Sequence, residues 1–236
     1  MTLQTIVPGK IWHAQQPIKF GPLSITTRST FVKLDDGSLW VHSPIAPTQA
    51  LLEEVNRIGP VRYVVAPNKS HHLFFTSFID NYPEAKGYLA PGLAKKGPDL
   101  ARYEELNDSS SQAWRPELVG YFVDGIPALN ETVWFHPETG TLIVTDLLCC
   151  FGNHHKGTIR LLARLLGVQA QMRMSRTMKL LAKDKTALAR VAQQLLTLDV
   201  HRVVLAHDQI VDGAVKAELE AAFSWLMQYI PISNTA

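Results

Sequence analysis

Apolar residues recur along this chain in two alternating patterns, short β-rich runs typical of buried strands and longer stretches with helical spacing. The strand-like runs cover residues 30–34, 38–41, 61–66, 87–90, 118–123, 131–135, 141–145 and 203–206. Helical spacing covers residues 47–58, 73–82, 158–198 and 215–230. Strands that alternate with helices in this order predict an α/β fold.

Turn-forming residues mark the borders of these elements. The Asp36-Gly37 step predicts a hairpin between the first two strands, and Gly59-Pro60 ends the first helix. Residues 91–116 are rich in Gly, Pro, Ser, Asn and charge. We interpret them as an irregular surface segment rather than a linker, and therefore expect a single domain over residues 1–236.

Length, net charge and cysteine content exclude some classes of protein but do not indicate a particular function. The 236 residues suffice for a substantial core, and the net charge of +2 is too small to indicate nucleic acid or an anionic membrane. The only cysteines are the adjacent pair Cys149-Cys150, which we expect to be small buried residues in a reducing cytoplasm. Neither a secretory signal nor a membrane-spanning run is expected.

Residues that could bind a metal or take part in catalysis lie directly after three separate strand-like runs. His71-His72 follows residues 61–66, Asp146 follows 141–145 and His207 follows 203–206. Ligands that are distant in sequence converge when they lie on loops at one edge of a sheet. Three imidazoles and one carboxylate suit Zn²⁺, with Fe²⁺ or Mn²⁺ as other options.

The sequence evidence for a role in the metal site is weaker for the other histidines. His42 ends a strand-like run and could support the site from behind or bind directly, although a buried core histidine fits equally. His136 lies in a hairpin turn, where a structural role is expected. His154-His155 is expected in a solvated loop that could border the site. Asp208, next to His207, could orient that imidazole or cap a turn.

This order of strand ends resembles the metallo-β-lactamase superfamily, in which a strand leads into a His-x-His-x-Asp-His loop. Ala66 to His72 takes the place of that loop, Asp146 matches the metal-bridging Asp, and His207 matches the final histidine. The likeness covers about residues 25–210, and the motifs resemble those of an uncharacterised branch known only as a domain of unknown function. It implies a four-layer α/β/β/α sandwich with the site at the sheet edges.

The chain also departs from that pattern. Pro67 and Lys69 replace the first two histidines, and His71 replaces the Asp of the loop. The stretch 125–131 has no histidine, and His42 stands where an early strand usually ends in Asp. The resemblance therefore implies one divalent transition metal, held by His71, His72, Asp146 and His207. Lys69 would place an ammonium near the vacant subsite, where it could hold an anionic group or an oxyanion.

Two functions remain open at this point. The first is a metal-dependent hydrolase of an ester, thioester, lactone or phosphoester, with Lys69 and Asp146 as catalytic residues. The second is a catalytically silent relative that binds a small molecule or a protein. A helical phosphohydrolase pattern is excluded, because these residues follow strands rather than lie on helices.

One segment of the chain is rich in cationic residues. Eight Lys and Arg residues lie between Lys156 and Lys185, against the single acid Asp184. A solvated helix face is the default interpretation, and binding of an anionic ligand or partner, such as an anionic small-molecule substrate, is the alternative. Nucleic acid is disfavoured because aromatic residues are not interleaved with these cations. The sequence leaves the oligomeric state open.

Overall fold

The first half of the chain forms a mixed seven-stranded sheet in a computed structural model that describes residues 2–20, 23–107 and 113–230. Its strands follow chain order: β1 (Gln4–Val7), β2 (Ile11–Phe20), β3 (Leu23–Lys33), β4 (Leu39–His42), β5 (Val61–Ala66), β6 (Lys86–Leu89) and β7 (Glu104–Glu105). The pairs from β1 to β4 are antiparallel and those from β4 to β7 are parallel. The carboxyl ends of β4, β5 and β6 therefore share one edge.

The second half forms a five-stranded sheet, in the order β12-β11-β10-β9-β8. The strands are β8 (Val119–Phe122), β9 (Thr132–His136), β10 (Thr141–Val144), β11 (Arg202–Leu205) and β12 (Ile210–Val211). The β10 and β11 strands are parallel, and Val144 stands opposite Leu205. The residues that follow these two strands consequently leave the sheet side by side.

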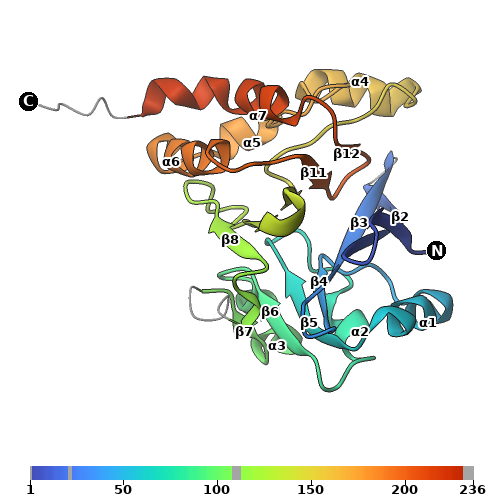
Figure 1. Cartoon of the computed structure of the whole chain (residues 1–236). Helices are drawn as coiled ribbons and strands as arrows, with labels where there is room; N and C mark the ends of the chain where they lie inside the picture. Colours follow the sequence, from blue (N-terminus) through green and yellow to red (C-terminus); the bar gives the residue numbers. More distant parts are fainter. Residues whose placement is uncertain (1, 21–22, 108–112, 231–236) are drawn as a thin grey trace, which may run out of the picture.

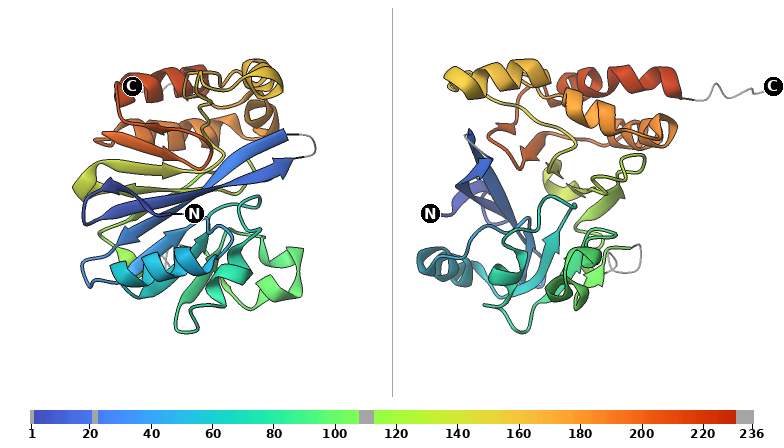
Figure 2. Two further views of the ribbon diagram at one scale, coloured as in Figure 1. Left: turned by 90° about the vertical axis from the view of Figure 1, so that its right-hand side faces the viewer. Right: turned by 180° about the vertical axis from the view of Figure 1, so that it is seen from behind.

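Helices cover the outer face of each sheet, which confirms the four-layer α/β/β/α arrangement (Figures 1 and 2). Below the seven-stranded sheet in Figure 1 lie α1 (Gln49–Ile58), α2 (Phe75–Ile79), the 3-10 turn η1 (Ala94–Lys96) and α3 (Pro98–Ala101). Above the five-stranded sheet lie α4 (Gly157–Leu166), α5 (Arg176–Leu181), α6 (Lys185–Leu196), α7 (Val215–Phe223) and η4 (Ser224–Tyr229). A further 3-10 turn, η3 (Pro137–Thr139), joins β9 to β10.

Three separate apolar clusters explain why the layers stack. One joins the seven-stranded sheet to α1 and α2, for example through Val64, Leu51 and Phe78. A second joins the five-stranded sheet to α6 and α7. The third lies between the two sheets and includes Trp40 and Trp134, whose ring centroids are 5.2 Å apart. Each sheet is apolar on both faces, so both faces must be covered.

Most predicted elements are confirmed, and the differences have local causes. The strand expected at 30–34 begins at Leu23, because its first half carries buried polar residues such as Thr27 and Ser29 that an apolar pattern does not reveal. The stretch 158–198 divides into α4, α5 and α6. The irregular segment contains η1, α3 and β7, while residues 108–112 of it lie outside the described part of the chain.

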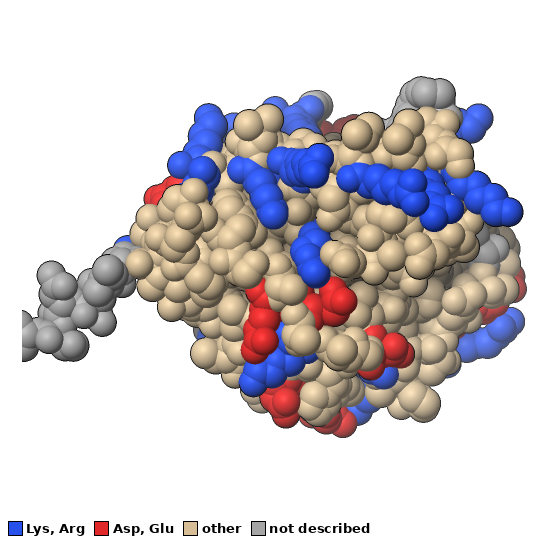
Figure 3. Space-filling model, turned by 90° about the horizontal axis from the view of Figure 1, so that it is seen from above, with Lys and Arg blue, Asp and Glu red and all other residues tan. Residues whose placement is uncertain are grey.

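Lys and Arg side chains are spread across the face formed by the upper helices (Figure 3). Several of the predicted cations have partners within the protein. Arg173 pairs with Glu218 at 3.1 Å, and the Lys179 ammonium lies 5.2 Å from the centre of the Trp225 ring. The solvated-face interpretation and its alternative stay predictions. Among the described residues, no helix is both long and apolar enough to cross a membrane.

Candidate metal centre

Three side chains from three different strand ends meet at one point. His71 lies in the turn after β5, Asp146 follows β10 and His207 follows β11. Because β10 and β11 are in parallel register, Asp146 and His207 leave the five-stranded sheet together. His71 arrives from the seven-stranded sheet, so the cluster bridges the two sheets rather than lying on one.

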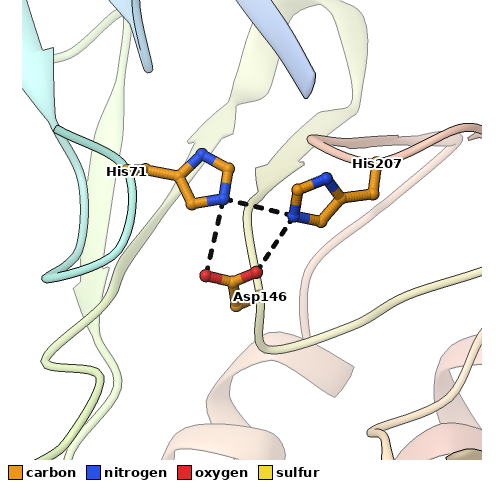
Figure 4. A group of neighbouring side chains, drawn as sticks. All are labelled: His71, Asp146 and His207. Carbon is orange, nitrogen blue, oxygen red and sulfur yellow. Dashed lines mark hydrogen bonds and ion pairs between the residues drawn. The ribbon is translucent and has the colours of Figure 1, made fainter. Parts of the chain in front are cut away.

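The reactive atoms of these side chains face one another at short range (Figure 4). The Nε2 atoms of His71 and His207 are 3.3 Å apart. His207 Nε2 is 3.2 Å from Asp146 Oδ1, and His71 Nε2 is 3.5 Å from Asp146 Oδ2. The three side chains are 7 to 15% exposed, so the cluster is largely shielded but can be reached from outside.

The outer nitrogen of each imidazole is held by a hydrogen bond. His207 Nδ1 lies 2.8 Å from the carbonyl oxygen of Thr26, which can only accept, so Nδ1 carries the proton. In the neutral ring the lone pair is then on Nε2, where it faces Asp146. His71 Nδ1 lies 2.7 Å from the Ser43 hydroxyl. Outer partners of this kind fix the tautomer and the ring orientation of metal-binding histidines.

This geometry fits a tetrahedral zinc ion. With bonds of about 2.0–2.1 Å, the ligand atoms of such an ion lie about 3.3 Å apart. The three separations in the cluster are 3.2, 3.3 and 3.5 Å. Two imidazole nitrogens and one carboxylate are also a suitable donor set for zinc, and three protein ligands leave a fourth position for water or substrate.

Asp146 and His207 shift each other's pKa values. Burial by itself would raise the pKa of Asp146, but the neighbouring His71 and His207 outweigh burial and hold that pKa well below its usual value. Burial would likewise lower the pKa of His207, yet the hydrogen bond that the protonated ring donates to the Asp146 carboxylate leaves that pKa raised. The carboxylate is therefore ionised and favours a positive charge between the rings.

Asn68 connects the His71 loop to Asp146. Its side-chain oxygen accepts from the backbone N–H groups of Ser70 and His71, both at 2.8 Å. Its amide nitrogen donates to Asp146 Oδ2 at 2.9 Å and to Thr145 Oγ1 at 2.8 Å. The side chain is fully buried. One amide thus sets the position of two candidate ligands.

Glu131 supports the same region from beneath. It is fully buried, and its carboxylate accepts from the backbone N–H groups of Thr145, Asp146 and Leu147 at 2.7, 2.8 and 3.0 Å. Burial and the nearby charge of Asp146 raise the pKa of Glu131. The sequence gives no sign of this role, because an acid before an apolar strand is ordinarily exposed.

Arg28 holds the loop that carries His207. This buried guanidinium donates to the carbonyl oxygens of Asp208 at 2.7 Å and Gln209 at 2.9 Å, and also to that of Leu205. Its Nε donates to His13 Nδ1 at 3.3 Å. The loop after β11 is thereby attached to β3 in the other sheet.

The His13–Arg28 contact predicts a loss of stability in acid. Burial, then the Arg28 charge, lowers the pKa of His13 from 6.5 to about 4. The folded protein therefore favours neutral His13, so this stability is complete above pH 6.5 and is lost as the pH falls toward 4. The loss amounts to up to about 3 kcal/mol. We expect urea unfolding at pH 7 and pH 4.5 to show a smaller difference for His13→Gln than for the unaltered protein; equal differences would contradict this assignment.

Two residues expected at the site are not brought into the cluster. His72 does not join the group of candidate ligands formed by the described residues, and its Nδ1 is buried without a hydrogen-bond partner among them. Burial, then the Lys96 charge, lowers its pKa. The Lys69 ammonium is turned to the carbonyl oxygen of Pro127 at 2.8 Å. Neither position supports the role expected from the sequence.

The residues expected to support the site behave differently from one another. His42 is buried and stacks on Trp40 at 5.5 Å, and burial, then the His71 charge, lowers its pKa to about 3. The hydrogen bond to His71 comes instead from the next residue, Ser43, whose φ of 51° is uncommon outside glycine. Asp208 does not hold the His207 ring, since Thr26 does.

Asp208 belongs to a second, more exposed group with the adjacent histidines. Its two carboxylate oxygens lie 3.2 Å from His154 Nε2 and 3.0 Å from His155 Nε2. The His154 side chain is 61% exposed, but that of His155 is only 16% exposed, so the solvated-loop prediction holds for His154 alone. The Asp208 carboxylate also accepts from the backbone N–H of Gly152 at 2.7 Å. These contacts close the loop between β10 and α4 against the loop that follows β11.

His136 and the cysteine pair lie outside the cluster. His136 is buried at the end of β9, where its Nδ1 is 3.0 Å from Thr139 Oγ1, in agreement with a structural role. Cys149 and Cys150 are free thiols, and Cys150 is buried. Burial raises the pKa of Cys149 well above its usual value and that of Cys150 to about 11. Both are therefore protonated at neutral pH. The expected burial is confirmed for Cys150, whereas Cys149 is only partly buried.

The adjacent histidines offer a direct comparison. We expect His71→Ala to abolish tight metal binding, because it removes one of three convergent ligand atoms. We expect His72→Ala to retain the metal, because its ring is not in the group. Elemental analysis of both variants after gel filtration measures this. Equal loss of metal in the two variants would show that His72 is the fourth ligand that the sequence predicted.

Comparison with known proteins identifies the fold of the chain. Residues 8–96 match a family described as Domain of unknown function (DUF4336). Nearly the whole chain superposes on solved metallo-β-lactamase structures at TM-scores of 0.60 and above. The chain has the metallo-β-lactamase fold. The match to DUF4336 includes His71 but ends before Asp146 and His207, so those two residues are related to the family only through the fold.

Three structures illustrate the likeness. The metallo-β-lactamase from Pontibacter korlensis is 13% identical, with 95% of this chain and 99% of that one covered at a TM-score of 0.60. One from Erythrobacter litoralis, with β-mercaptoethanol in the active site, is 12% identical, with 94% and 96% covered at 0.63. FIM-1 from Pseudomonas aeruginosa in its mono-zinc form is 11% identical, with 98% and 96% covered at 0.62. No curated protein sequence matches the chain. At these identities the metallo-β-lactamase comparison establishes the fold alone.

Proposed function

We propose that the protein is a metal-dependent hydrolase with one divalent transition metal at the His71–Asp146–His207 cluster. The convergence of two imidazole nitrogens and a carboxylate at 3.2 to 3.5 Å carries this proposal. Zinc is favoured over iron or manganese, because a three-residue set of this type and spacing suits tetrahedral coordination. When bound, such a metal lowers the pKa of a coordinated water toward neutrality and supplies hydroxide.

The protein's own residues prepare the site in two ways. Thr26 and Ser43 direct the Nε2 atoms of the two histidines inward. Asn68 fixes one carboxylate oxygen of Asp146, so that the other remains directed at His207. In this proposal Asp146 therefore acts as a ligand whose charge is already in place before the substrate arrives.

A single metal is favoured because the second subsite lacks ligands. The resemblance places two histidines of the fold family at Pro67 and Lys69, which provide no imidazole. Pro67 is buried, and Lys69 is directed to the Pro127 carbonyl. A catalytic role for Lys69 is therefore not part of this proposal.

A cavity of about 320 Å³ with a mixed polar and apolar lining, which we call the mixed cavity, opens onto the cluster and suits a small-molecule substrate. Its apolar lining residues include Ile18, Leu73 and Phe74, and its polar ones include Thr27, Ser43, Ser70 and the cation Lys19. These groups can hold the polar part of an ester, thioester, lactone or phosphoester. A lone exposed lysine provides limited attraction for an anionic group.

The alternative, a silent binding protein of the same fold, is favoured by one observation, the loss of the two histidines at Pro67 and Lys69. Metal content and turnover distinguish the two functions. Protein purified without a histidine tag is expected to contain about one equivalent of transition metal and to hydrolyse a member of an ester, thioester, lactone and phosphoester panel. Absence of metal after reconstitution with zinc, iron and manganese would favour the binding protein.

A further inference from the structure

The helix α4 covers a cavity instead of packing into the core. Of its ten residues only Ala163 is fully buried, whereas α6 buries five of its twelve. Ile159, Leu162 and Leu166 share one face of α4 at helical spacing and are only half-buried. Apolar side chains left half-covered over a hollow mark a place where a ligand completes the packing.

This cavity reaches the candidate metal centre. Its volume is about 390 Å³, and we call it the chain pocket. Its walls include Ile159, Leu162 and Leu166 of α4 together with Ile25, Phe151 and Val168. Asp146 and His207 also line it, and both line the mixed cavity as well. The two cavities therefore meet at the metal centre; the chain pocket has an almost wholly apolar lining, and the mixed cavity has both polar and apolar walls.

We infer that the substrate is an acyl compound whose aliphatic chain occupies the chain pocket. This inference rests on the proposed hydrolase function and specifies its substrate class. The carbonyl carbon would lie at the cluster and the leaving group in the mixed cavity, where Thr27, Ser43 and Ser70 offer polar contacts. A phosphoester is disfavoured, because among the described residues neither Lys nor Arg lines the chain pocket, and Lys19 is the single Lys or Arg that lines the mixed cavity.

The pocket is large enough for an aliphatic chain, because its volume of about 390 Å³ lies within the range of about 300–1,000 Å³ typical of small-molecule sites. In the reaction, the oxygen of water bonds to the carbonyl carbon as the C–O or C–S bond breaks. The leaving oxygen or sulfur takes up a proton from that water, and the products are a fatty acid and an alcohol or thiol.

Two matched substitutions on α4 test the pocket. Ile159→Trp places a large ring in the chain pocket, whereas Leu161→Trp places the same ring on the outer face, where Leu161 is 59% exposed. Leu162→Gln provides a second change, polar and of similar size, should the Trp variant fold poorly. Binding of a dansyl-labelled undecanoic acid is measured by fluorescence on metal-free and metal-loaded protein, since chain recognition needs no metal.

We expect Ile159→Trp to weaken binding of this probe at least tenfold, Leu162→Gln severalfold, and Leu161→Trp less than twofold. We also expect kcat/KM to rise from acetyl to octanoyl p-nitrophenyl esters, by up to about fourfold per methylene. The octanoyl-to-acetyl ratio should fall in Ile159→Trp and persist in Leu161→Trp.

The two measurements separate the pocket from the hydrolase. Probe binding that Ile159→Trp abolishes, without hydrolysis of any ester, would support the pocket and overturn the hydrolase. Hydrolysis with no dependence on chain length, and no binding of the probe, would overturn the pocket and leave the hydrolase in place. Equal effects of Ile159→Trp and Leu161→Trp would also overturn the pocket.

Discussion

His207→Ala is expected to reduce bound transition metal from about one equivalent to a trace, and to reduce turnover by at least a hundredfold. The substitution removes the nitrogen that lies within 3.3 Å of both other candidate ligands, 3.3 Å from His71 Nε2 and 3.2 Å from Asp146 Oδ1. Loss of an outer partner of a ligand costs about 10–100-fold in affinity, and loss of the ligand itself costs more. Elemental analysis after gel filtration gives the metal content.

His136→Ala is the matched control, because His136 is also a buried histidine at a strand end. Its ring contacts Thr139 and is not part of the cluster. We expect this variant to retain its metal even if it is less stable. If His207→Ala kept one tightly bound equivalent, or if His136→Ala lost it, the metal centre would be wrongly assigned.

Glu131→Ala is expected to lower the free energy of unfolding by about 3–5 kcal/mol. The substitution leaves the buried backbone N–H groups of Thr145, Asp146 and Leu147 without their carboxylate acceptor. Each buried donor left unsatisfied costs about 1–3 kcal/mol, and local rearrangement recovers part of the sum. Urea unfolding followed by circular dichroism measures the change.

Glu138→Ala is the control for Glu131→Ala. Its carboxylate pairs with Lys10 at 2.7 Å but is 59% exposed, so its removal should cost less than about 1 kcal/mol. We further expect Glu131→Ala to weaken metal binding, because the backbone that carries Asp146 loses its anchor. A change below 1 kcal/mol for Glu131→Ala would show that water replaces the carboxylate and that the site does not depend on it.

The pattern of apolar residues determines the main strands and the positions of the candidate ligands along them. Asp146 and His207 are predictable because each directly follows a short apolar run, and adjacent parallel strands bring such residues together. The sequence also indicates that Pro67 and Lys69 cannot replace two histidines of the fold family. The four-layer arrangement, by contrast, came from resemblance, since strand and helix order alone gives only α/β.

The tertiary structure decided which of two adjacent histidines joins the cluster. His71 and His72 are equivalent in the sequence, but Asn68 binds the backbone N–H of His71, and Ser43 holds its ring. Asn68 is a local partner, whereas Ser43 follows the neighbouring strand β4, and Asp146 and His207 come from the other sheet. Local spacing cannot reveal these last three contacts.

The supporting residues depend on the same long-range contacts. Glu131 has the appearance of a surface acid in the sequence, yet it is buried under Asp146 because the loop after β10 folds back over it. The periodicity of apolar residues therefore predicts on which strand or helix a residue lies, and whether it lies at the end of that element. Which side chains then meet depends on how the two sheets pack, because hydrogen bonds between distant loops choose the orientation of each ring and carboxylate.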